Sequence, residues 1–156
     1  MNQQASIEQV AGILARHDYV FGTHPDGDRY RLPFGEDAVF VNFGTWRDRI
    51  VITVSSPVLQ IDPEGPAGAV VLNELNELNR LGPFVKFMLA DETLVAACDV
   101  LGEALQASEL INAIDSVAAA ADHAAAKLQP QTGGRRHADV MAQHAVHADD
   151  NEAPEA

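Results

Sequence analysis

The chain has 156 residues and a formal net charge of −13, from 23 acidic and 10 basic side chains. Its length suits one domain, and its 47% hydrophobic residues predict a packed core rather than a disordered chain. So few Lys and Arg residues argue against nucleic acid as a partner, and the negative charge disfavours an anionic membrane surface. A basic or amphipathic peptide partner is compatible with this charge, although solubility alone explains it at least as well.

Cys98 is the only cysteine, so no intrachain disulfide can form. Small secreted domains usually pair their cysteines. A signal peptide begins with basic residues, whereas this chain carries no basic side chain before Arg16. No apolar run approaches the ~20 residues of a membrane span. We therefore expect a cytoplasmic protein.

The first predicted element is a helix over residues 7–17. Ser6 and Gln9 have the spacing of a capping box, and apolar residues then recur at helical intervals. A turn is expected over residues 23–28, which contain Pro25, Asp26 and Gly27.

Three strands follow, over residues 29–32, 38–43 and 50–55, because β-branched and aromatic residues alternate with others there. The connections between them are short, which predicts antiparallel neighbours. Pro57 is expected to end the third strand.

The remaining pattern predicts a helix, a hairpin and a long final helix. An apolar stripe indicates the second helix, which Gly82 and Pro83 end: Val71, Leu72, Leu75, Leu78 and Leu81. Residues 85–89 and 93–100 read as hairpin strands, and Ser108 as the N-cap of a helix over 109–128. The fold class is therefore α+β, a single antiparallel five-stranded sheet with three helices in the order α-β-β-β-α-β-β-α.

The composition changes after Leu128. Residues 129–156 hold few large apolar side chains, so we expect a domain over residues 1–128 and a disordered polar tail over 129–156. His137, His144 and His147 could gather a zinc or nickel ion, but a flexible tail offers no preformed geometry. We predict no metal site, no cofactor and no catalytic residue, and Cys98 reads as a core residue.

Alternation also divides the predicted sheet into two faces. The face turned away from the helices carries apolar residues bordered by basic ones, a pattern typical of protein-binding surfaces: Arg29, Arg31, Phe40, Val51, Lys86, Met88 and Val95. The C-terminal helix or a second subunit could instead cover this face. Along the second helix, Asn73, Asn76 and Asn79 form either a solvated face or a ladder that bonds neighbouring backbone or a partner.

Three segments resemble the YbjN-domain and type III secretion chaperone family, in particular its actinobacterial YbjN-like group. They are residues 52–59 (ITVSSPVL), the pair 72–76 (LNELN) with 84–87 (FVKF), and residues 97–101 (ACDVL) before the last helix. The resemblance covers residues 6–128. It implies a noncatalytic, cytoplasmic, peptide- or protein-binding role of chaperone type, often as a homodimer.

Two alternatives stay open. One is a small enzyme whose site is assembled from scattered polar residues such as His17, Asp18 and Asn76. The other is a regulatory or structural interaction domain without chaperone activity. A cleft that gathers titratable groups would favour the enzyme, and a shallow apolar patch or a two-fold interface would favour a binding module.

Overall fold

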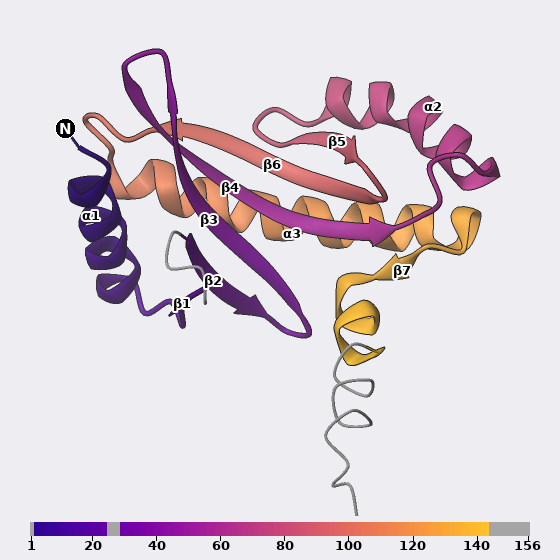
Figure 1. Cartoon of the computed structure of the whole chain (residues 1–156), viewed down its shortest axis with the longest axis horizontal. Coiled ribbons are helices and arrows are strands. Elements are labelled where there is room, and N and C mark those ends of the chain that lie inside the picture. Colours follow the sequence, from indigo (N-terminus) through magenta and orange to yellow (C-terminus); the bar gives the residue numbers. More distant parts are fainter. Residues whose placement is uncertain (1, 25–28, 144–156) are drawn as a thin grey trace, which may run out of the picture.

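The computed structural model describes residues 2–24 and 29–143, and in it the long helix α3 runs along one face of an antiparallel sheet (Figure 1). The elements in chain order are α1 (Gln3–Arg16), β1 (Gly22–Thr23), β2 (Arg29–Phe34), β3 (Asp37–Trp46), β4 (Arg49–Gln60), α2 (Pro66–Leu81), β5 (Lys86–Ala90), β6 (Thr93–Leu101), α3 (Ala107–Thr132) and β7 (Arg135–Arg136). A further short helix occupies residues 137–143.

The α+β class and the antiparallel sheet are confirmed, since every strand pair in the described residues is antiparallel. The numbers of strands and helices are wrong. The sheet has seven strands in the order β1-β2-β3-β4-β6-β5, with β7 on β4, and a fourth helix follows β7. Both extra strands have two residues each, which is too short for an alternation pattern to reveal.

Pro57 does not end the third strand, because β4 continues to Gln60. The pairing of β4 with β6 shifts register between Pro57 and Leu59, an irregularity that accommodates the proline and its missing N–H. Val58 and Leu59 are both buried, at 2% and 1% exposure. The irregularity therefore lets two consecutive apolar residues reach the core.

Two predicted N-caps are also wrong. Asn2, not Ser6, caps α1 by accepting a hydrogen bond from Ala5 N at 2.8 Å, and Ser6 lies buried inside the helix. At α3, Gln106 is the N-cap, and its backbone N–H donates to the Glu109 carboxylate at 2.9 Å. In both cases a better-placed polar residue lies upstream of the one predicted.

The predicted boundary at Leu128 falls inside α3, which continues past Pro130 to Thr132. Gly133 ends the helix with a φ of 65°, the left-handed conformation that glycine adopts without strain. Residues 135–136 then pair with β4, so the predicted disorder is wrong for residues 129–136. Residues 144–156 lie outside the described residues.

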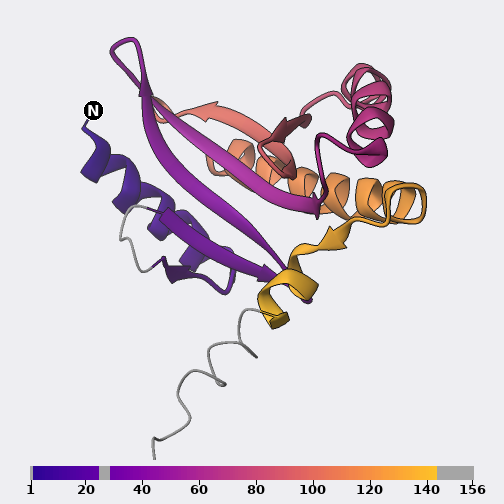
Figure 2. The same ribbon diagram turned by 45° about the vertical axis from the view of Figure 1, so that its right-hand side comes forward.

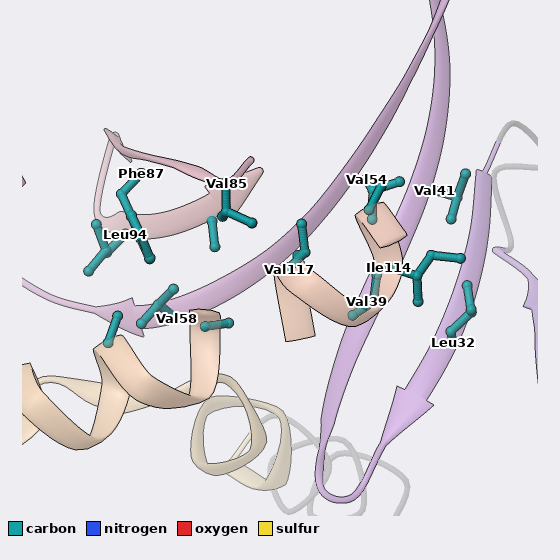
Figure 3. Close-up of a cluster of buried hydrophobic side chains, with 14 of the residues drawn as sticks. Leu32, Val39, Val41, Val54, Val58, Val85, Phe87, Leu94, Ile114 and Val117 are labelled. Atoms are coloured by element: carbon teal, nitrogen blue, oxygen red, sulfur yellow. The ribbon is translucent and has the colours of Figure 1, made fainter. Parts of the chain in front are cut away.

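The core lies between the sheet and the helices. Figure 3 shows side chains of β2, β3 and β4 around Ile114 of α3, and Phe87 of β5 and Leu94 of β6 further along the same buried cluster. Leu32, Ile114 and Val117 have no exposed surface, as expected for the inward positions of alternating strands and of a helical stripe. No helix within residues 2–24 and 29–143 has the length and hydropathy needed to cross a membrane.

A tyrosine ties the end of α1 to α3. Tyr19 Oη donates to Asp115 Oδ1 at 2.8 Å, and burial together with this carboxylate raises the pKa of Tyr19 to about 12. Because the folded pKa lies above the usual value near 10, this contribution to stability is complete below pH 10 and is lost as the pH rises towards 12. We expect phenolate absorbance to show one tyrosine that ionises late, and Tyr19→Phe to remove this component. An unchanged titration in Tyr19→Phe would contradict the assignment.

Candidate functional site

The sheet face opposite α3 carries the residues that the sequence assigned to it. Cross-strand register places Arg31 beside Phe40, and Met88 beside Val95. Their inward neighbours Leu32, Val39 and Leu94 are buried, whereas Phe40, Val51 and Val95 keep part of their surface and Met88 is 48% exposed. Strand alternation therefore separates the two faces as predicted.

One end of this face forms an apolar hollow of about 510 Å³ next to the β3–β4 hairpin. Its lining comes from three strands: Gly44, Thr45, Trp46, Val51, Thr53, Asp99, Val100 and Leu101. Trp46 is 59% exposed and Leu101 is 41% exposed, which is high for such large apolar side chains. The Arg47 guanidinium lies 4.7 Å from the centre of the Trp46 ring and covers part of it.

A single carboxylate sits within this apolar lining. Asp99 is exposed, and its Oδ1 accepts a hydrogen bond from Thr53 Oγ1 at 2.6 Å across the β4–β6 pair. The hollow can thus take an apolar side chain and, beside it, a cationic one. Sequence reasoning missed Trp46, Asp99 and Leu101. Extending the alternation of the β3 strand past Phe43, and that of β6 past Val100, would have found Trp46 and Leu101.

The other end of the face is centred on Phe40 and is largely covered. Arg29 lies over the Phe40 ring at 5.2 Å, and its Nη2 is 2.8 Å from His24 Nε2. The imidazole of His137, from the short helix after β7, meets the same ring edge-on at 6.1 Å. Burial, with a contribution from Arg31, lowers the pKa of His137, while Asp37 opposes this change. Phe40 is therefore partly covered by these side chains, although part of its surface remains exposed.

Lys86 points away from the centre of the face. Its Nζ donates to the carbonyl oxygens of Asn79 and Gly82, both at 2.9 Å, and so satisfies carbonyl groups at the C-terminal end of α2. Arg31, by contrast, is exposed near the β2–β3 turn. The three basic residues predicted to border the face thus occupy three different settings.

The three asparagines of α2 also differ. The Asn79 side chain accepts from Phe87 N at 2.7 Å and donates to Phe87 O at 3.2 Å, so it pairs with the backbone of β5, the last strand of the sheet. Asn73 and Asn76 are exposed. The ladder that bonds neighbouring backbone is therefore present at Asn79 alone among the three.

We expect Asn79→Ala to lower the free energy of unfolding by about 2 kcal/mol, because two backbone groups of a partly buried strand lose their partners at about 1 kcal/mol each. Asn76→Ala is the matched control on the same helix and should change stability by less than about 0.5 kcal/mol. Urea denaturation of both variants measures the difference. Equal stability of the two variants would show that the Asn79 contacts contribute nothing.

The residues of the predicted enzyme site are not brought together. His17 and Asp18 follow α1, while Asn76 lies on α2, and these helices stand at opposite ends of the molecule in both views (Figures 1 and 2). Cys98 packs half-buried against the core, where burial raises the pKa of its thiol. Among residues 2–24 and 29–143, no cluster of three or more His, Cys, Asp or Glu side chains could hold a metal ion. His144 and His147 lie outside these ranges.

Solved structures with a similar fold are known. An uncharacterized protein from Methanothermobacter thermautotrophicus superposes with a TM-score of 0.61 at 15% identity, covering 81% of this chain and 99% of that protein. YbjN from E. coli superposes with a TM-score of 0.54 at 14% identity, covering 77% of this chain and 91% of YbjN. A comparison with curated proteins found no match.

The family assignment comes from the sequence itself. Residues 4–140 match the model of a family described as T3SS (YopN, CesT) and YbjN peptide-binding chaperone 1. The match takes in the whole sheet, all of α2 and α3, and β7. The resemblance seen in the sequence is thereby confirmed and extends further along the chain. This protein belongs to the TY-Chap1 family of peptide-binding chaperones and is a peptide- or protein-binding module of chaperone type.

Proposed function

We propose that the chain is a cytoplasmic chaperone-type module that binds client peptides on the open sheet face, with the hollow at Trp46 as its main anchor site. The single observation that carries this proposal is the exposure of Trp46 and Leu101 around Val51 on a face that α3 does not cover. Exposed apolar groups gathered in this way favour a protein contact. The absence of a second cysteine to pair with Cys98 supports the cytoplasm.

The lining of the hollow favours one kind of peptide. An apolar client side chain would pack on Trp46, Val51 and Leu101, and a neighbouring Lys or Arg would reach the Asp99 carboxylate. The net charge of −13 favours the same basic, amphipathic clients by raising their encounter rate at low salt. Of the other residues predicted for the site, Met88 and Val95 extend the apolar surface, and Phe40 and Arg29 form its covered end.

Trp46 offers a direct test because it is the only tryptophan. We expect its fluorescence emission to shift to the blue when amphipathic peptides that pair Leu or Phe with Lys or Arg are added. The affinity should fall with added salt and with Asp99→Asn. Peptides in which Glu replaces the basic residues are the matched control. A Trp46 signal that does not respond to any peptide, or responds equally to both sets, would remove the hollow as the anchor site.

We also propose that the chain forms a homodimer through α2, which the resemblance to YbjN-type and secretion chaperones suggests. Leu72 is 57% exposed and lies on the same side of α2 as Asn76, with Asn73 next to it. Leu81, which is 68% exposed, lies nine residues further on and so faces the opposite side of the helix.

Light scattering should therefore give about twice 16.7 kDa for the native chain. Leu72→Glu should give a monomer, because it places a charge in the apolar part of the interface. Leu81→Glu is the control and should remain dimeric. A monomeric native chain at all concentrations would reject the dimer, and monomers from both variants would reject this side of α2.

A further inference from the structure

The C-terminal segment, residues 134–143, lies on the sheet as a bound peptide would. In both views the short helix after β7 lies beside the β2–β3 turn, far in sequence from both strands (Figures 1 and 2). The segment begins at Gly134 and is joined to α3 through Gly133, whose left-handed conformation turns the chain back towards the sheet.

The segment adds a strand at a free backbone edge. Pairing between β3 and β4 ends at the Phe40–Ser55 pair, so the last residues of β4 extend beyond β3. There Arg136 pairs with Leu59, and Arg135 with Gln60, on the side of β4 that β6 does not use. Adding a strand to an exposed edge is a common way for proteins to bind extended peptides.

Side chains of the segment hold it in place. The Arg136 guanidinium bridges Asp122 Oδ1 of α3 at 2.8 Å and Asp37 Oδ2 of β3 at 3.3 Å. Arg135 Nη2 donates to Gln60 Oε1 at 3.1 Å and also bonds Gln143 at the end of the described helix. The Arg136 guanidinium therefore fixes the segment between two carboxylates. Basic side chains are scarce in this chain, because acidic side chains outnumber them.

The helical part of the segment covers the apolar end of the face. His137 packs on Phe40, and His137 and Val140 border a small hollow of about 300 Å³ with Arg29, Pro57 and Thr93. Pro57 and Phe40 belong to the same open face as the Trp46 hollow. The covered half and the open half are thus two ends of one surface.

We propose that residues 134–143 are an intramolecular occupant of the Phe40 end of this face, and that a client peptide reaches that end by displacing them. This inference rests on the proposed peptide-binding role of the sheet face. The client that fits there has the chemistry of the segment itself: an extended stretch that pairs with β4, an Arg for the Asp37–Asp122 pair, and a short amphipathic helix over Phe40.

The test uses the full chain and a fluorescent peptide with the sequence of residues 134–143. A locked form carries Gln60→Cys and Arg135→Cys, because these residues are direct partners on antiparallel strands, the geometry that a disulfide requires. Cys98→Ala in the same chain removes the native thiol, so the two new thiols can form a disulfide only with each other. A released form carries Arg136→Ala, which removes both ion pairs of the segment. Lys127→Ala is the matched control, because it removes a similar ion pair, to Glu74, away from the segment.

Fluorescence anisotropy should show that the released form binds the peptide about fivefold more tightly than the native chain, since two partly exposed ion pairs no longer hold the segment. The locked form should bind at least about tenfold more weakly when oxidised than when reduced, because a tethered segment competes at millimolar effective concentration. Lys127→Ala should match the native chain. Equal binding by the oxidised and reduced locked form, or no binding to any form at millimolar peptide, would overturn the proposal.

A second readout keeps this inference separate from the proposed function. Trp46 emission, followed in titrations with the amphipathic peptides, reports on the other end of the face, which Trp46 lines. If Trp46 responds to no amphipathic peptide while oxidation still controls binding of the segment peptide, the Trp46 site is wrong and the displaceable segment stands. If Trp46 responds as expected and oxidation has no effect, the segment is a fixed part of the fold.

Discussion

We expect Val51→Asp to fold normally and to lose client peptides, whereas Ile52→Asp, one residue further along β4, should not fold. Val51 is partly exposed and lines the Trp46 hollow, so a carboxylate there stays hydrated and costs within about 0.5 kcal/mol. Ile52 has no exposed surface, and an unpaired charge at its position is expected to cost several kcal/mol. A domain of this size has about 5–15 kcal/mol of stability in all.

The loss of binding in Val51→Asp follows from the chemistry of the hollow. The new carboxylate would stand close to the apolar surface of Trp46 and Leu101 and would leave no dry contact for an apolar client side chain. Circular dichroism melting and peptide titration, both on each variant, give the two readouts. Val51→Thr, which keeps the shape of the side chain, is the control and should retain most of the binding.

Two results would contradict this account. If Val51→Asp unfolds, the residue is packed in the native chain, by a second subunit or by another segment. If Val51→Asp folds and still binds client peptides, the Trp46 hollow is not the anchor site, and the Phe40 end or α2 becomes the place to look.

This pair of variants also shows what the sequence could predict. Strict alternation along 39–43 and 50–54 identifies the inward residues Val39, Val41, Ile52 and Val54, because each strand is half-buried and its two faces meet different surroundings. The same pattern identifies Val51 and Phe40 as residues of the other face. The order of residues along each strand therefore predicts which side chains are buried and which are exposed.

What the sequence could not show depends on contacts between distant segments. β7 is a strand only because the end of β4 extends beyond β3, and nothing in the residues Arg135 and Arg136 favours a strand. The covered state of Phe40 depends on His137, nearly a hundred positions away. Pro57 misled the prediction because an irregularity in pairing, which tolerates proline, has no sequence signal of its own.

Gly68→Ala should destabilise the protein by several kcal/mol. At Gly68, as at Pro57, packing rather than local preference decides the structure. A Cβ atom at Gly68 would lie 2.2 Å from the carbonyl oxygen of Pro63. Such a short distance to a backbone atom cannot be relieved by rotating a side chain, so the 62–65 turn or the first turn of α2 must move. Helix propensity alone predicts the opposite result, since Ala is favoured over Gly by about 1 kcal/mol within a helix.

Gly12 of α1 provides the matched control. A Cβ atom there would meet nothing closer than the Arg16 side chain, at 3.8 Å, so Gly12→Ala should raise stability by about 0.5–1 kcal/mol. Urea denaturation of the two variants therefore compares the same chemical change in two helices. An increase in stability for both would mean that the first turn of α2 does not pack on the carbonyl of Pro63.

The effect of Gly68→Ala on function should be smaller than its effect on stability. α2 holds the edge strand β5 through Asn79, but the β3–β4 hairpin that carries Trp46 lies at the other side of the molecule (Figure 1). At temperatures where Gly68→Ala is still folded, client peptides should therefore shift Trp46 emission with nearly the native affinity. A large loss of affinity in the folded variant would show that the position of α2 is transmitted through β5 and β6 to Val100 and Leu101, and that the hollow depends on the whole sheet.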